Sequence, residues 1–291
     1  MSTVAREHVA DAVRQRTRRW PAGMIATYAL LVVTSAVLLF PLFWMTTTSL
    51  KTLQQAETFP PVWWPQPWMW KNYVDLFTTL PFGTFTRNSV IITAIDTFGT
   101  VVSSSIIAFA FARLRARGSN VLFIVLLSTL MLPGSVIQVP TFIIFKTLHW
   151  IDTFYPLTVP SFFGDAFSIF LLRQYYSTIP FDLDEAAVID GAGWLTIYWR
   201  IILPLARPAL ATVAILTIVA NWTDFFGPLI YLNSLDKMTL AVGLTFFHGQ
   251  HTTNLVLEMA GAAYSTLPML VLFFLAQRYF VAGITLTGLK G

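Results

Sequence analysis

Residues 180–204 read PFDLDEAAVIDGAGWLTIYWRIILP, and they predict two short helices joined by a turn. Asp182 can cap the first helix, and Glu185, three positions later, can bond back to the cap amide as in a capping box. Gly191 and Gly193 allow a chain reversal that a residue with a Cβ atom resists. The stretch is therefore expected to be a folded loop rather than a plain connection.

The second helix of this loop is expected to be amphipathic and to end at Pro204. Its apolar residues recur at i, i+3, i+4 and i+7, the spacing of one helix face: Trp194, Ile197, Tyr198 and Ile201. The first helix holds four of the fourteen acids of the chain, namely Asp182, Asp184, Glu185 and Asp190. A charged helix with small residues beside an amphipathic one is typical of a surface that a partner protein binds.

Outward from the loop, the chain consists of long apolar segments. With 56% hydrophobic residues, 11% charged residues and a mean hydropathy of +0.67, it is neither a soluble domain nor a disordered chain. A bilayer core about 30 Å thick needs roughly 20 apolar residues in a helix. Six segments meet this requirement, at about 24–49, 88–112, 119–145, 156–172, 208–232 and 259–277.

The sequence thus predicts an all-α polytopic membrane protein with six transmembrane helices. Residues 1–23 form a basic N-terminal segment, and residues 24–291 form one transmembrane domain that includes the loop 180–204. The first apolar segment is longer than the core of a signal peptide, so we expect it to be an uncleaved helix.

The distribution of basic residues predicts the orientation of these helices. Of the 18 Lys and Arg residues, five lie on one side of the predicted membrane: Lys51, Lys71, Arg87, Lys146 and Lys237. The other 13 lie at the termini, between the second and third segments and around the loop 180–204, so the positive-inside rule places both termini and this loop in the cytoplasm. The basic pI of about 9.4 therefore reflects topology and does not indicate nucleic-acid binding.

The outer segment 51–87 contains four of the ten tryptophans: Trp63, Trp64, Trp68 and Trp70. Indole rings prefer the level of the lipid headgroups, so an interfacial belt is one interpretation. The other interpretation is a binding surface, because aromatic rings also stack on sugars or pack against a docking protein.

Polar and helix-breaking residues lie within the predicted membrane segments. The third segment contains Pro133 and Pro140, with Gly134, Ser135 and Gln138 between them. Because proline removes a hydrogen bond from a helix, we expect this segment to be broken or kinked there. Polar groups at membrane depth face protein or water, which makes four residues candidates for a translocation path: Gln138, Asn221, Thr223 and Asp224. Hydrogen bonds between helices would use the same residues.

With these residues in view, the loop resembles the EAA loop of ATP-binding-cassette (ABC) importer permeases. The family pattern is EAA, three residues, Gly, nine residues, Ile, any residue and Leu-Pro. It fits without a gap at Glu185, Ala186, Ala187, Gly191, Ile201, Leu203 and Pro204. The six-segment layout and the ending QRYFVAGITLTGLKG, residues 277–291, look like the shorter permease subunit of maltose-type carbohydrate importers. Residues 221–225, NWTDF, resemble a Trp-Asn-Asp-Phe motif of that group, although Thr223 stands where the group has Asn.

The resemblance implies a type I ABC importer permease fold and a coupling role for the loop. Its first helix sits in a cleft of an ATPase subunit, with Glu185 and Asp190 facing that subunit, the bend at Gly191, and Trp194 and Ile197 packed against the permease. The implied coupling residues are Glu185, Ala186, Ala187, Asp190, Gly191, Ala192, Ile201, Leu203 and Pro204.

The resemblance also implies partners and a location. The partners are a second homologous permease, a dimer of ATP-binding subunits that hold ATP and Mg, and an extracytoplasmic solute-binding protein. The solute is a carbohydrate, a di- or oligosaccharide, although polyols and glycerol phosphates use similar machinery. The location is the inner (plasma) membrane, where the chain is multi-pass and surrounded by lipid.

Several kinds of chemistry are absent from the sequence. There is no cysteine and no Gly-Lys pair, so thiolate chemistry and a phosphate-binding GxxxxGK loop are both excluded, and any ATPase must be another chain. There is no HExxH or GxSxG motif, and His248 and His251 fit a solvated loop better than a metal site. We therefore expect no enzyme activity, cofactor or metal in this chain, and no nucleic-acid partner.

Three acids within the membrane segments support one alternative. Asp96, Asp165 and Asp224 could belong to a proton- or ion-coupled secondary transporter, because buried charges are costly and often mark an ion path. None of them has a Lys or Arg partner within its own segment.

Overall fold

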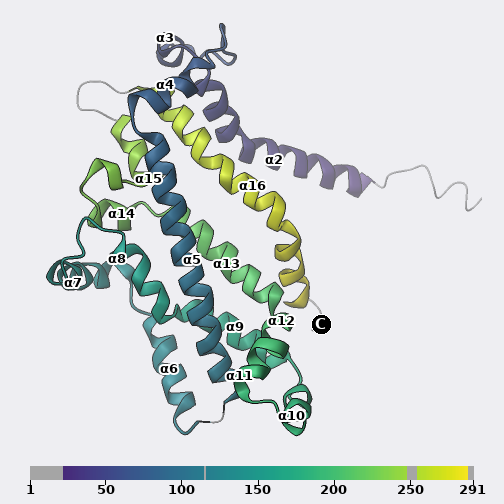
Figure 1. Ribbon diagram of the computed structural model, residues 1–291. Helices are drawn as coiled ribbons and strands as arrows, with labels where there is room; N and C mark the ends of the chain where they lie inside the picture. The colour runs from purple at the N-terminus through teal and green to yellow at the C-terminus, as the bar shows by residue number, and fades with distance from the viewer. Residues whose placement is uncertain (1–21, 115, 248–253, 288–291) are drawn as a thin grey trace, which may run out of the picture.

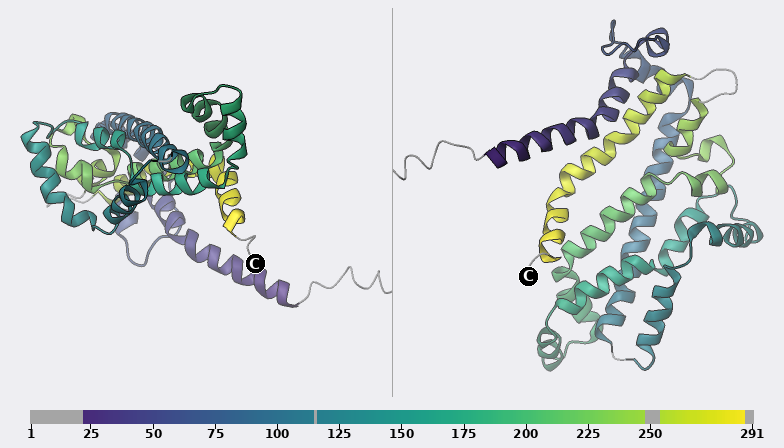
Figure 2. Two further views of the ribbon diagram at one scale, coloured as in Figure 1. Left: turned by 90° about the horizontal axis from the view of Figure 1, so that it is seen from below. Right: turned by 180° about the vertical axis from the view of Figure 1, so that it is seen from behind.

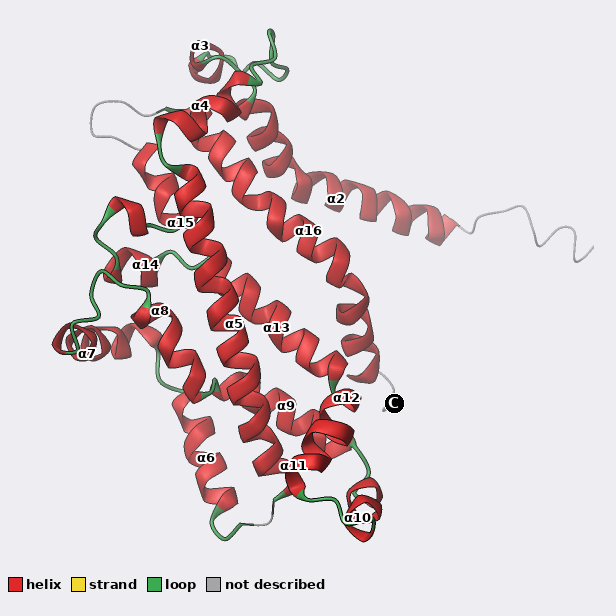
Figure 3. Ribbon diagram, in the orientation of Figure 1, coloured by secondary structure: helices red, strands yellow, loops and turns green. Residues whose placement is uncertain are grey.

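The computed structural model describes residues 22–114, 116–247 and 254–287, and across these ranges the chain forms helices and no strand (Figure 3). The predicted all-α class is therefore confirmed. The basic residues before position 22, His248, His251 and the last four residues of the sequence lie outside the described ranges.

Among the described residues, four helical segments are long and apolar enough to cross a membrane: Gly23–Ser49, Phe82–Arg113, Tyr155–Thr178 and Leu255–Gln277. The number rises to six if each of two sharply bent helix pairs is one crossing. The first bent pair matches the predicted third segment. The six-helix topology and its orientation stay predictions.

The break predicted in the third segment is confirmed, and of its two prolines Pro133 lies at the break whereas Pro140 lies inside the following helix. Helix α6 (Ser119–Thr129) and helix α7 (Gly134–Thr147) meet at an angle of 97°. Pro133 between them has an extended backbone, with φ −60° and ψ 133°. Since proline carries no N–H, the helix loses a hydrogen bond at this point.

The segment 208–232 is interrupted as well. Helix α13 (Arg207–Trp222) ends before Asp224, and the short helix α14 (Phe226–Tyr231) follows. The side chain of Asp224 accepts a hydrogen bond from the backbone N–H of Gly227 at 3.2 Å, which satisfies a donor in the first turn of α14.

Helix α5 (Phe82–Arg113) runs through the middle of the molecule and packs against α13 and α9 (Ala166–Thr178) (Figure 1). It contributes to two separate hydrophobic cores. One core lies at the end of the molecule that carries α10 (Asp182–Ile189) and contains Phe109, Leu172 and Ile197. The other lies at the end that carries α4 (Lys71–Thr79) and contains Phe82, Phe85 and Trp222. Between the two cores α5 carries polar residues.

Helix α2 (Ala22–Ser49) and helix α16 (Leu255–Thr287) are joined at the α4 end, and α2 then diverges from the rest of the molecule (Figure 2). The apolar window of α2 is 0% buried in this chain. Such a surface is suited to lipid or to another membrane helix.

The remaining helices are short connections at the two ends and along the body. They are α3 (Leu53–Glu57), α4 (Lys71–Thr79), α8 (Tyr155–Thr158), η1 (Val159–Phe163), α10 (Asp182–Ile189), α11 (Trp194–Ile197), η2 (Tyr198–Ile202), α12 (Leu203–Leu205), η3 (Leu235–Lys237), α15 (Leu240–Gly243) and η4 (Leu244–Phe247).

Candidate functional site

The loop 180–204 forms a protruding end of the molecule, with α10 at its tip (Figure 1). Glu185, Ala186 and Asp190 are exposed there. Ala187 and Ala192 are half-buried and pack against the core at the α10 end. Glu185, Ala186 and Asp190 therefore face outward, and Ala187 and Ala192 anchor the loop to the core.

The start of α10 differs from the predicted capping box. The helix begins at Asp182 itself, and the preceding cap position is Phe181, which makes no side-chain capping bond. The acids Asp182, Asp184 and Glu185 lie in the first turn, where a negative charge is favourable near the positive end of the helix dipole. The prediction that Asp182 caps the helix was wrong.

The turn after α10 depends on Gly191, which has a left-handed φ of +81°. The N–H of Ala192 reaches back to the carbonyl of Ala187 at 2.9 Å and closes the reversal. Gly193, by contrast, is extended, with φ −80° and ψ 163°. Only the first of the two predicted turn glycines therefore needs a glycine backbone.

The second helix of the loop is less regular than predicted. It is one α-helical turn, α11, followed by the π-helical turn η2. Ile197 and Tyr198 are buried in the core, whereas Trp194 is 49% exposed. The prediction that Trp194 packs inward with Ile197 was therefore wrong. The chain stays helical through Leu205, one residue beyond Pro204.

The loop exposes a large apolar surface. Ile189 is 85% exposed and Leu195 71% exposed, and other apolar side chains around them are also exposed: Phe181, Leu183, Val188, Trp194 and Trp199. Exposed apolar patches rimmed by polar residues mark surfaces where proteins or membranes bind.

Arg113, at the end of α5, holds the start of this loop from inside. Its guanidinium lies 3.3 Å from the carboxylate of Asp184, donates a hydrogen bond to the carbonyl of Ile179 at 2.8 Å, and lies 4.3 Å from the ring centre of Phe181. Burial raises the pKa of Asp184 above its ordinary value, while the positive charge of Arg113 opposes this rise. From the sequence alone, Arg113 was only one of the basic residues that predict the orientation of the helices.

A second buried contact connects α5 to the loop. The hydroxyl of Ser105 lies 2.7 Å from the Tyr176 hydroxyl of α9 and 2.8 Å from the Tyr198 hydroxyl of η2. Residues in three elements thus share one hydrogen-bonded group. A serine in an apolar segment gives no sequence signal for such a role.

A polar layer lies halfway along α5, between the two cores. Asn221 donates a hydrogen bond to the carboxylate of Asp96 at 2.5 Å. Two cavities meet at Asn221. One, of about 250 Å³, is also lined by Asp224, Ser89 and Thr239, and the other, of about 510 Å³, is lined by Asp96, Asp165 and Thr100 among others.

The four candidate path residues are placed differently. Asn221 and Asp224 both line the smaller cavity. Thr223 is exposed, and its hydroxyl donates to the carbonyl of Val219 at 2.8 Å. Gln138 is half-buried on α7 and lines neither cavity.

Each of the three acids of this layer accepts a hydrogen bond within the chain. Asp96 accepts from Asn221, and Asp165 caps α9 by accepting the N–H of Ser168 at 2.7 Å. Asp224 forms the turn bond to Gly227. Within the described part of the chain, no group of three or more His, Cys, Asp or Glu side chains could hold a metal ion.

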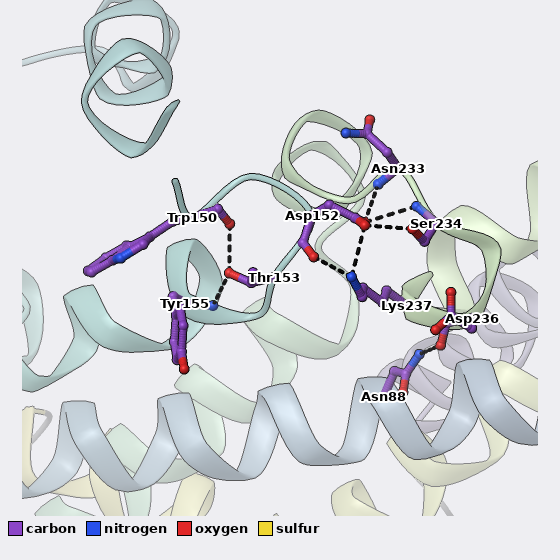
Figure 4. Close-up of polar contacts among 9 residues, drawn as sticks. All are labelled: Asn88, Trp150, Asp152, Thr153, Tyr155, Asn233, Ser234, Asp236 and Lys237. Atoms are coloured by element: carbon purple, nitrogen blue, oxygen red, sulfur yellow. Dashed lines mark hydrogen bonds and ion pairs between the residues drawn. The ribbon is translucent and has the colours of Figure 1, made fainter. Parts of the chain in front are cut away.

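At the opposite end, Asp152 joins two loops (Figure 4). One carboxylate oxygen accepts the N–H groups of Asn233 and Ser234, both at 2.9 Å, and the other lies 2.8 Å from Nζ of Lys237. These contacts lower the pKa of Asp152, with the Lys237 bond the largest cause. Nearby, Asn88 of α5 donates to the carbonyl of Asp236 at 2.8 Å.

The tryptophan-rich segment divides into two pairs. Trp63 and Trp64 pack against aromatic residues of α2, with Trp63 edge-on to Trp44 and Trp64 edge-on to Phe43. Trp68 and Trp70 stack on each other and are exposed. Only the first pair therefore continues the surface of an apolar helix.

Comparison with known proteins gives consistent similarities. A family described as binding-protein-dependent transport system inner membrane component matches residues 101–285. The chain is 32% identical over 264 residues to the trehalose/maltose transport system permease protein MalG of Thermococcus litoralis, covering 89% of this chain and 94% of MalG. It is 32% identical over 229 residues to the arabinooligosaccharides transport system permease protein AraQ of Bacillus subtilis, covering 78% of this chain and 81% of AraQ.

Two further similarities also extend over most of the chain. The inner membrane ABC transporter permease protein YcjP of Escherichia coli is 30% identical over 284 residues, 94% of this chain and 99% of YcjP. A chain of a bacterial ABC transporter that imports the acidic polysaccharide alginate has the same fold. It superposes with a TM-score of 0.76 at 24% identity and covers 89% of this chain and 96% of that one.

Proposed function

The chain belongs to the family of binding-protein-dependent transport system inner membrane components, and from this premise we propose that it is the permease subunit of an ATP-driven ABC importer for carbohydrates. One observation carries the proposal. The family match over residues 101–285 encloses a loop with the complete EAA spacing, and that loop protrudes from one end of the molecule.

The loop 180–204 is the proposed contact with the ATPase. The exposed carboxylates of Glu185 and Asp190 supply polar contacts, and Ile189 and Leu195 supply apolar area. Ala186 allows close approach of the partner, and Gly191 makes the bend. Ala187, Ala192, Ile201, Leu203 and Pro204 complete the coupling surface and its support.

Asn221 and Asp224 are the proposed polar surface of the translocation path. They line the same cavity in the polar layer, and a path for a sugar needs hydroxyl-binding groups at membrane depth. Thr223 is exposed one position away, and Gln138 enters the path if the sister permease brings α7 against it.

A di- or oligosaccharide is the proposed solute. The names of two relatives refer to trehalose and maltose and to arabinooligosaccharides, and a third, AmyC of Thermoanaerobacterium thermosulfurigenes, is named for starch degradation products. The chain pairs with a second homologous permease, an ATP-binding subunit dimer and an extracytoplasmic solute-binding protein. It crosses the inner (plasma) membrane several times, with both termini in the cytoplasm.

The ion-coupled alternative is not favoured. The relatives are named as transport permeases, several of them of ABC transporters. Asp96, Asp165 and Asp224 each accept a hydrogen bond within the chain, which gives each of them a structural role.

The test replaces Glu185 in the complex with the sister permease and the ATPase subunits. Glu185→Lys reverses a charge at the proposed contact, so ATPase pull-down and ATP-driven sugar uptake should both fall about tenfold, while membrane insertion stays normal. Glu57→Lys, at an exposed glutamate of α3 at the opposite end, is the matched control and should leave both unchanged. Normal pull-down and uptake in Glu185→Lys would contradict the docking assignment.

A further inference from the structure

The buried pair of Arg113 and Asp184 connects the loop 180–204 to the helix that lines the polar cavities. We propose that Arg113 and Asp184 are positioning residues that transmit the movement of α10 directly to α5, an inference that rests on the proposed function. In this mechanism α5 is the element through which the ATPase acts on the polar layer.

The contacts of Arg113 are concentrated where the loop leaves α9. The guanidinium contacts the backbone of Ile179, the ring of Phe181 and the carboxylate of Asp184, which are consecutive points on the chain entering α10. A planar guanidinium can donate a hydrogen bond, lie over a ring and pair with a carboxylate at the same time. Movement of α10 therefore acts on the end of α5 through this one side chain.

Burial of the Arg113–Asp184 pair is expected to contribute little to the free energy of unfolding. The side chains of Arg113 and Asp184 are 0% and 4% exposed, and the nearest nitrogen and oxygen are 3.3 Å apart. Among the described residues, neither oxygen of Asp184 has a partner with hydrogen-bond geometry. Desolvation of such a pair can exceed its attraction, so apolar residues of similar volume often fold as well or better. The pair is therefore better explained by the connection it makes between α10 and α5 than by a contribution to stability.

The other end of the connection is the polar layer. Asp96, Thr100 and Ser89 of α5 line the two cavities, and Asp96 is bonded to Asn221 of α13. Arg113 lies 17 residues after Asp96, which is about 25 Å along an α-helix. Because α5 is one uninterrupted helix that packs against α9 and α13, a displacement at Arg113 reaches Asp96 without passing through a loop.

The experiment separates the connection from docking and from folding. The double variant Arg113→Met and Asp184→Leu removes both charges, so no unpaired charge stays buried. In the complex with the sister permease and ATPase subunits, this variant should fold and bind the ATPase as the wild type does. A thiol in the polar layer reports whether the movement arrives there. The chain has no cysteine, so Thr100→Cys adds a single one, which lines the larger of the two cavities.

ATP should change the rate at which a water-soluble maleimide labels Thr100→Cys in the otherwise wild-type chain. We expect a change of about tenfold, within the usual range of coupling between distant sites. In the double variant this dependence on ATP should disappear, although pull-down and ATP hydrolysis persist. The control Lys71→Met and Asp75→Leu removes an exposed pair, with its atoms 3.9 Å apart, and should keep the wild-type dependence.

The outcomes distinguish the two proposals. A double variant that binds the ATPase and keeps the full ATP dependence of labelling overturns the connection and leaves the proposed function intact. A wild-type chain that does not bind an ATPase overturns the proposed function itself. If the double variant does not fold, Arg113→Lys decides, because it keeps the charge but cannot hold all three contacts. Retained pull-down with a reduced ATP dependence then supports the connection, and an unchanged dependence refutes it.

Discussion

At Gly191 the backbone adopts a conformation that other residues resist. With φ at +81° and nothing within 4 Å of the position of an added Cβ, the cost of a side chain there is purely conformational. Gly191→Ala should lower the free energy of unfolding by about 1–2 kcal/mol, read from thermal unfolding of the purified chain, and weaken ATPase pull-down.

Gly193→Ala is the matched control for this prediction. Gly193 also has nothing within 4 Å, but its φ of −80° suits any residue. The alanine should be neutral or stabilising by up to about 1 kcal/mol. Equal destabilisation by both substitutions would contradict the conformational explanation.

Asp152 predicts a dependence of stability on pH. Its bonds to Lys237, Ser234 and Asn233 lower its pKa in the folded chain, whereas the ordinary value for Asp is about 3.9. As the pH falls below that value the unfolded chain takes up a proton before the folded one, so this stabilisation is present above about pH 4 and is lost as the pH falls further.

Asp152→Asn tests this interpretation. At neutral pH the variant should be less stable by about 2 kcal/mol, the cost of losing bonds to a charged group. Its unfolding temperature should fall less steeply than that of the wild type between pH 5 and pH 3. Parallel curves of unfolding temperature against pH for the two chains would show that the pKa of Asp152 is the same in the folded and unfolded states, which would contradict this interpretation.

At the scale of elements, Ser105 is the point where α5, α9 and η2 meet. Ser105→Ala leaves the hydroxyls of Tyr176 and Tyr198 without their shared partner in a buried place, which should cost about 1–3 kcal/mol in thermal unfolding. Adding Tyr176→Phe and Tyr198→Phe removes the orphaned groups and should restore most of the loss. If the triple variant is less stable than Ser105→Ala alone, the hydroxyls have other partners.

Helix boundaries divide into those that composition determines and those that packing determines. A break in the third segment is predictable because proline lacks an N–H, but the choice between its two prolines is not, since Pro140 lies inside α7 and only Pro133 lies at the break. The start of α10 was mispredicted: the Asp182 cap needs a non-helical residue at that position, whereas Asp182 is the first helical residue. The π-helical turn that begins at Tyr198 was also missed; the hydroxyl of Tyr198 bonds to Ser105, 93 positions away, a contact that no local pattern indicates.

At the scale of the molecule, the exposed half of the candidate site could be read from sequence and the buried half could not. Glu185 and Gly191 belong to a contiguous motif whose spacing is its signal. Arg113 and Asp184 are 71 positions apart and meet only after α5 and α9 pack together. Pairing across that separation leaves no local pattern, and the same holds for Asp96 with Asn221 and for Asp152 with Lys237.

The division of the interior into two cores has a consequence for how the molecule opens. The core at the α10 end and the core at the α4 end share no residue, and the polar layer around Asp96 and Asn221 separates them. Amide hydrogen exchange should accordingly show two protected blocks, one for each core, that exchange independently. A single block spanning both would mean that the two cores unfold together despite the polar layer between them.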